Sequence, residues 1–95
     1  MLKLRRYTGA VLAALEEGLR KLGVEVRIVD IAGDARVQGG LCTIRGTRVV
    51  LVSGAAPPAE RIAILAGALA ALDTERIYLP PAARDLVERT RTRAR

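Results

Sequence analysis

The sequence predicts a small single-domain α+β fold. We expect an N-terminal helix, a three-stranded largely antiparallel sheet with a hairpin at residues 40–53, a buried Ala/Leu-rich helix at 58–72 and a short C-terminal helix. Two observations favour it. The hairpin segment contains two apolar runs of strand length around an Arg-Gly pair, and a double proline then leads into an apolar run of helix length. Neither part is stable alone in water, so we expect the helix to cover the strands.

Length and composition limit the core. A chain of 95 residues forms one domain and buries only somewhat more than half of its unfolded surface, so a partner would add useful stability. Hydrophobic residues make up 51% of the chain but aromatic residues only 2%, so the core must consist of Leu, Val, Ile and Ala. Few aromatic platforms are left for ligands or bases to stack on, which argues against small-molecule and RNA-stacking sites.

The cysteine and histidine content limits cofactors. One cysteine and no histidine allow no disulfide within the chain and make a poor ligand set for zinc, so we expect no metal and no cofactor. No signal-peptide pattern opens the sequence, and the longest apolar run, Ile62 to Leu72, is too short to span a membrane. We therefore predict a cytoplasmic protein. Arginine far outnumbers lysine, which suits a heat-adapted or GC-rich source.

Residues 2–22 have the period of an amphipathic helix. Acidic residues precede basic ones in its second half, as the helix dipole favours, and Gly23 is placed to end the helix in the left-handed conformation. Gly9 weakens the first half, so a start near Thr8 stays open. The apolar face consists of Leu4, Tyr7, Val11, Ala14, Leu15, Leu19 and Leu22.

Residues 24–31 alternate as a strand does, with one face buried and the other partly in water. Val24, Val26 and Ile28 point to one side, and Glu25, Arg27, Val29 and Ile31 to the other. The next segment, AGDARVQGG, is rich in glycine but matches no phosphate-binding motif, so we interpret it as a turn.

The hairpin register follows from its turn. With Arg45 and Gly46 as the two turn residues, the paired positions are Ile44 with Thr47, Thr43 with Arg48, Cys42 with Val49, and Leu41 with Val50. We expect the core face to carry Ile44, Cys42, Val49 and Leu51. Cys42 is then a small core residue. Because a left-handed arginine is unfavourable, a three-residue loop that shifts the register by one stays open.

The helix at 58–72 is apolar around its whole circumference. Ile62, Leu65, Leu69 and Leu72 form one stripe, and the remaining positions are mostly Ala or Gly. A helix of this kind is buried on more than one side, either by the rest of the chain or by a second copy in a symmetric dimer, and both explanations stay open. The partner-interface candidates are the small residues Ala63, Gly67, Ala70 and Ala71.

The C-terminal segment begins with an extended piece at 76–79, followed by a helix from about Pro81 to Arg89. We divide the chain into a domain at 1–88 and a basic disordered or frayed tail at 89–95. Without the tail the formal net charge falls from +6 to +2, so the folded part is nearly balanced. The nucleic-acid candidates are Arg89, Arg91, Arg93 and Arg95, assisted by Arg5, Arg6 and Arg48.

No group of side chains indicates catalysis. The commonest catalytic base, histidine, is absent, and every acidic residue has an Arg or Lys within a few positions, as solvated surface charges usually do. We therefore expect no catalytic residues and no enzyme activity.

One resemblance covers about a third of the chain. The run TIRGTRVVLVSGAAPPAERIAILAGALAALD resembles the strand, turn, strand and helix segment of ImmA/IrrE-like zinc metallopeptidases that carries their H-E-x-x-H motif. The motif's histidine, glutamate and second histidine fall on Ala66, Gly67 and Ala70. The resemblance therefore implies a truncated, metal-free scaffold without the family's protease activity.

Two functional hypotheses follow. The first is a non-catalytic interaction or structural module that forms a homodimer, or binds a protein partner, through its Ala/Gly-rich helix or its hairpin edge. The alternative is weak, sequence-independent nucleic-acid binding through the arginine-rich tail.

Overall fold

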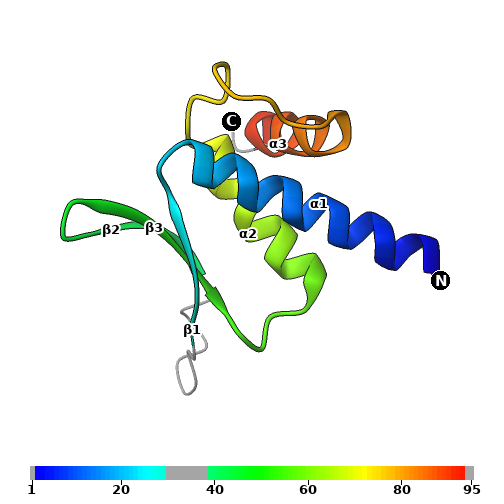
Figure 1. Ribbon diagram of the computed structural model, residues 1–95, viewed down its shortest axis with the longest axis horizontal. Coiled ribbons are helices and arrows are strands. Elements are labelled where there is room, and N and C mark those ends of the chain that lie inside the picture. The colour runs from blue at the N-terminus through cyan, green and yellow to red at the C-terminus, as the bar shows by residue number, and fades with distance from the viewer. Residues whose placement is uncertain (1, 30–38, 94–95) are drawn as a thin grey trace.

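A computed structural model of the chain describes residues 2–29 and 39–93, with the side chains of the first helix from Thr8 onward. The α+β class is confirmed, with helices near both ends, a central hairpin and an apolar helix after it (Figure 1). The elements in chain order are α1 (Leu2–Lys21), β1 (Glu25–Val29), β2 (Gly39–Ile44), β3 (Thr47–Ser53), α2 (Pro58–Ala70) and α3 (Pro81–Arg93).

The described sheet is mixed. Its strand order is β1-β3-β2, in which β2 pairs antiparallel with β3, and β1 pairs parallel with β3. A largely antiparallel sheet was expected, and only the hairpin has that geometry. Alternating apolar side chains specify which face of β1 is buried but not the direction in which the strand runs, so the sequence pattern left the parallel pairing open.

The predicted hairpin register is confirmed at all four pairs, from Ile44 with Thr47 to Leu41 with Val50. Arg45 has a φ of 51° and Gly46 a φ of 82°, as a two-residue turn of the primed type requires. The chain therefore accepts a left-handed arginine in order to keep the short loop, and the three-residue alternative is wrong.

The predicted core face of the hairpin is wrong for three of its four residues. Val49 is fully buried as expected, but Ile44 is 37% exposed and Cys42 and Leu51 are half-buried. The core instead contains Val50 and Val52, with Leu41 packed against it. Residues 49–52 are all apolar, so β3 alone gives no preference between its faces. The preference comes from β1. Its parallel register with β3 puts Glu25 and Arg27 beside Val49 and Leu51, so this side carries the charges of β1 even though Val49 itself is fully buried.

Helix α1 ends as predicted. Gly23 has a φ of 77°, its N–H donates to the carbonyl of Arg20 at 3.0 Å, and the next N–H donates to the carbonyl of Leu19 at 2.9 Å, which is the Schellman arrangement. The helix runs through Gly9, so the late start is not adopted. Val11, Leu15 and Leu19 are buried.

The segment before α3 packs closely on α1. A Cβ added to Gly18 would lie only 2.7 Å from Leu79 Cδ2, so any larger residue here would have to displace the buried Leu79 side chain. In the piece predicted to be extended at 76–79, Arg76 lies in a turn, Ile77 in a bend, and residues 78–79 have no regular secondary structure; Leu79 is buried. Helix α3 continues to Arg93, four residues beyond the predicted end.

None of the described helices is long and apolar enough to cross a membrane.

Candidate interaction surface

Helix α2 lies at the centre of the helical layer. Pro57 precedes its first turn in an extended conformation, Pro58 begins the helix, and Glu60 places a negative charge near the free N-terminal amides. Leu65, Ala66, Ala68 and Leu69 are buried in the core. Leu69 faces α1, since its Cδ1 would lie 3.6 Å from a Cβ on Gly18.

The opposite side of α2 is exposed. Gly67 and Ala71 each lie two positions from Leu69, about 200° around the helix. Ala63 and Ala71 are exposed, and a Cβ added to Gly67 would meet no heavy atom within 4 Å. We call Ala63, Gly67 and Ala71 the outer stripe of α2. The fourth predicted interface residue, Ala70, is half-buried at the border of this stripe.

Arg91 holds the C-terminal end of α2. Its Nε donates to the Ala70 carbonyl at 3.1 Å and its Nη2 to the Leu72 carbonyl at 3.0 Å, while Nη1 pairs with Glu88 at 2.6 Å. These carbonyls have no partner within the helix, so the guanidinium satisfies them and also complements the negative end of the helix dipole. Arg91 was predicted to bind nucleic acid, but much of its hydrogen-bonding capacity is used inside the fold.

A second arginine of α3 has a similar role. Arg84 Nη2 donates to the carbonyls of Thr74 and Ile77 at 3.1 and 2.9 Å, which holds the turn that connects α2 to α3. Thr74 is the one buried polar residue of the described core. Sequence reasoning missed both arginines because their partners lie 7 to 21 positions away and form no local pattern.

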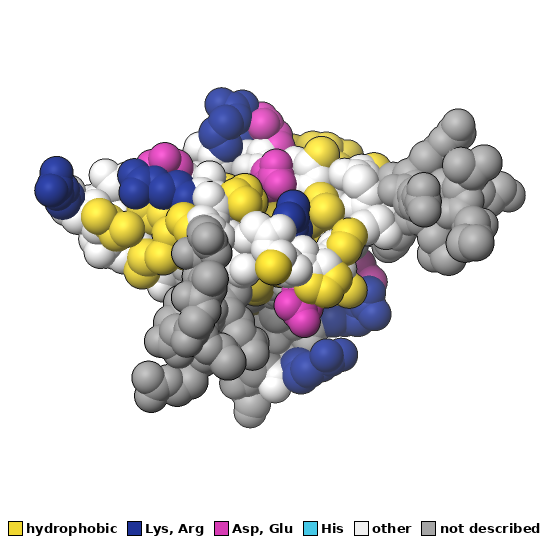
Figure 2. Space-filling view, turned by 90° about the horizontal axis from the view of Figure 1, so that it is seen from below, with side chains coloured by type: hydrophobic (Ala, Val, Ile, Leu, Met, Phe, Trp, Pro, Cys, Tyr) yellow, Lys and Arg dark blue, Asp and Glu magenta, His cyan; other side chains and the backbone are white. Residues whose placement is uncertain are grey.

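The other predicted nucleic-acid residues do not form one cluster. Arg89 pairs with Asp85 at 3.0 Å on the exposed side of α3, and Arg93 is exposed in the last described turn. Arg48 is exposed near the hairpin tip. Figure 2 shows the basic side chains of one face scattered, several of them beside acidic ones. Arg95 and the side chains of Arg5 and Arg6 lie outside the described residues.

Several ionisable groups of the described region form surface ion pairs. The hydrogen bonds from Arg27 lower the pKa of the Glu25 carboxyl below its ordinary value of 4.5, and those from Arg20 have the same effect on the pKa of Glu17. Both side chains are exposed, to 46% for Glu17 and 50% for Glu25. Within residues 2–29 and 39–93, no three of the Cys, Asp and Glu side chains gather in a way that would hold a metal ion.

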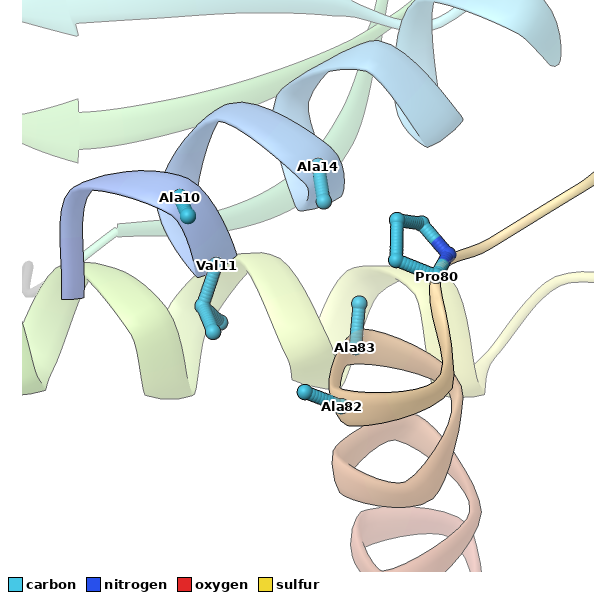
Figure 3. Close-up of a pocket in the computed structure, with 6 residues that line it drawn as sticks. All are labelled: Ala10, Val11, Ala14, Pro80, Ala82 and Ala83. Carbon is cyan, nitrogen blue, oxygen red and sulfur yellow. The ribbon is translucent and has the colours of Figure 1, made fainter. Parts of the chain in front are cut away.

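Among the hollows on the described part of the surface, two are lined by apolar or backbone groups. The smaller, of about 140 Å³, lies between α1 and the start of α3 and is lined by Ala10, Val11, Ala14, Pro80, Ala82 and Ala83 (Figure 3). The wider one, of about 460 Å³, is lined by Ile28, Val29, Gly54 and Ala55 at the ends of β1 and β3. A specific small-molecule site needs a few polar groups to orient its ligand, and neither lining provides a polar side chain.

The residues at the motif positions of the ImmA/IrrE-like family lie on α2 but face different surroundings. Ala66 is buried, Gly67 is partly exposed with open space beside it, and Ala70 is half-buried. The resemblance stays a prediction. Comparisons with protein-family models, curated proteins and solved structures found no match for this chain.

Proposed function

We propose that this protein is a non-catalytic assembly module that associates with a second copy of itself through the outer stripe of α2. The observation that carries the proposal is the exposure of Ala63 and of the C-cap residue Ala71, with the partly exposed Gly67 between them, on a helix that is apolar around its circumference. An apolar helix face gains about 25 cal/mol for each Å² that leaves water. Side chains this small also let a second helix approach to the lower end of the usual spacing of about 8–10 Å.

A two-fold axis beside Gly67 makes this stripe self-complementary. In an antiparallel pair of α2 helices, Gly67 faces Gly67 of the second copy and Ala63 faces Ala71 of the second copy. The same patch is then used by both copies, as in most homodimers. We also keep a cytoplasmic location within this proposal, as the sequence predicted.

The test compares two identical substitutions on exposed helical alanines. Ala63→Glu puts a charge into the outer stripe, whereas Ala13→Glu puts one on the exposed side of α1. Light scattering coupled to size-exclusion chromatography is expected to show a dimer for the wild type and for Ala13→Glu, and a monomer for Ala63→Glu. Equal masses for the two variants would contradict an interface at the stripe.

The exposure of Arg89 and Arg93, four positions apart on α3, supports the second candidate function, nucleic-acid binding. Such binding is weak, independent of sequence and strongly dependent on salt. The variant to test replaces Arg89, Arg93 and Arg95 with Gln in the full chain and keeps Arg91, because Arg91 contributes to the fold. If duplex DNA binding at physiological salt is the same for this variant and the wild type, the arginine-rich end has no such role.

A further inference from the structure

Among the described residues, strand β2 forms an edge of the sheet and lacks the usual protection. Edge strands in natural proteins commonly carry charged residues or proline, which discourage pairing with another chain. The opposite edge, β1, carries Glu25 and Arg27, joined by an ion pair at 3.0 Å. Strand β2 reads Gly-Gly-Leu-Cys-Thr-Ile, with no charge and no proline. Of the two described edges, β2 is therefore the one suited to backbone pairing.

The hydrogen bonds of the sheet show which backbone groups of β2 point outward. The N–H of Gly54 donates to the carbonyl of Val29 at 2.9 Å, so even-numbered residues at this end of β3 point toward β1 and odd-numbered ones toward β2. In the observed register, the odd-numbered residues of β3 pair with Ile44, Cys42 and Gly40. The other residues of β2, which are Gly39, Leu41 and Thr43, therefore direct their backbone N–H and C=O groups away from the sheet.

This edge lies on the same side of the molecule as the outer stripe of α2. Helix α1 contacts β1, whereas α2 contacts β2 and β3, and the outer stripe faces away from α1. The exposed edge of β2 and the outer stripe of α2 therefore lie on the same side of the molecule, opposite α1 and β1.

The spacing of the two layers is compatible with one two-fold axis. Helix α2 contacts both β2 and β3. Adjacent strands lie about 4.8 Å apart, so a helix centred over these two strands is about 5 Å from an axis midway between two β2 strands. The two α2 helices would then be about 10 Å apart. Packed helices have interaxial distances of about 8–10 Å, so the pairing that joins the sheets also brings the two stripes into contact.

We infer that two copies pair β2 with β2 in antiparallel register about Leu41 and share a single continuous sheet, with the outer stripes of α2 packed across the same axis. The inference rests on the proposed self-association. Leu41 faces Leu41 of the second copy, and Thr43 faces Gly39 of the second copy. This register uses all three outward-facing residues and forms about six backbone hydrogen bonds.

The size of the contact predicts a reversible dimer. A standard interface buries about 800 Å² per partner with about 20–30 residues, whereas β2 and the outer side of α2 provide about a dozen residues. The buried area is then about 400 Å² per partner, which is typical of weak complexes. We expect a dissociation constant in the micromolar range.

The first experiment removes one outward-facing N–H. Thr43→Pro deletes a donor that the internal β2–β3 ladder does not use, and Thr43→Ala is the matched control that keeps it. The pairing loses about two hydrogen bonds per dimer, which corresponds to about a thirty-fold weaker association for Thr43→Pro than for Thr43→Ala in sedimentation velocity. Far-UV circular dichroism at low concentration checks that both variants remain folded.

The second experiment follows individual amides by hydrogen exchange and does not depend on a variant. The amides of Leu41 and Thr43 are expected to become protected as the wild-type concentration rises, while exchange of the outward-facing amides of β1 stays unchanged. If the wild type dimerises and Ala63→Glu abolishes the dimer, but Leu41 and Thr43 exchange rapidly at every concentration, the strand pairing is wrong and the helix contact stands. If the wild type stays monomeric throughout, both the pairing and the proposed function are wrong.

Discussion

Replacing Arg91 with alanine should destabilise the domain far more than its position near the end of the chain suggests. The side chain is 26% exposed and donates to the carbonyls of Ala70 and Leu72 at the C-terminal end of α2. Without it these carbonyls lose their partner, and α3 loses a direct link to α2. The fold therefore depends on a residue within the arginine-rich segment.

The magnitude follows from the two backbone contacts. Hydrogen bonds that involve a charged group contribute about 1.5–3 kcal/mol each, and partial exposure to water reduces this to about 1–1.5 kcal/mol. Arg91→Ala should therefore lower the free energy of unfolding by about 2–3 kcal/mol, a large part of the roughly 5–15 kcal/mol available to a domain. In a domain of this size the melting temperature should fall by about 10–20 °C.

Arg89→Ala is the matched control. Arg89 belongs to the same helix and also pairs with an acidic residue, but both partners of that pair, Arg89 and Asp85, are more than 60% exposed. Its removal should cost no more than about 0.5 kcal/mol. Urea unfolding followed by far-UV circular dichroism measures both variants. Equal stabilities for Arg91→Ala and Arg89→Ala would refute the anchoring role of Arg91.

Four further substitutions test the local structure. Gly9→Ala should raise the free energy of unfolding by about 0.5–1 kcal/mol in urea denaturation, because alanine favours a helix more than glycine does. Gly18→Val should lower the free energy of unfolding by about 1–3 kcal/mol, because the Leu79 side chain packs closely against Gly18. Arg45→Asn should raise the melting temperature, since asparagine tolerates a φ of 51° better than arginine. The pKa of Glu25, measured by NMR titration, should lie below 4.5 in the wild type and should rise in Arg27→Ala. Because the pKa is lowered in the folded state, the ion pair stabilises the fold above pH 4.5, and this contribution is lost as the pH falls through the folded-state pKa. An unchanged pKa in Arg27→Ala would show that the ion pair does not form in solution.

The sequence could predict the elements and the hairpin register because both depend on local chemistry. The two residues that suit a tight turn fix all four pairs between β2 and β3, and Gly23 fixes the end of α1. The face of β3 that meets the helices could not be predicted in the same way. Val49 and Val50 are equally apolar and both fully buried, and only the charges on β1, which pairs in parallel, distinguish the two sides.

The candidate surface was predictable in part. The small residues of α2 stand out in the sequence, and the structure places Ala63, Gly67 and Ala71 together on an exposed face. The sequence could not predict which arginines are available to bind a partner. Arg89 and Arg91 have the same local composition, but Arg91 reaches α2 because α3 crosses beside the end of that helix, a long-range contact that leaves no pattern in the sequence.

Sedimentation equilibrium of the unmodified chain over a wide concentration range tests self-association most directly. The apparent mass should rise from the 10.2 kDa of one chain at low micromolar concentration toward twice that value at high concentration, and it should fit a monomer–dimer equilibrium. A mass that stays at 10.2 kDa up to about 1 mM would show that the exposed face of α2 does not associate with itself.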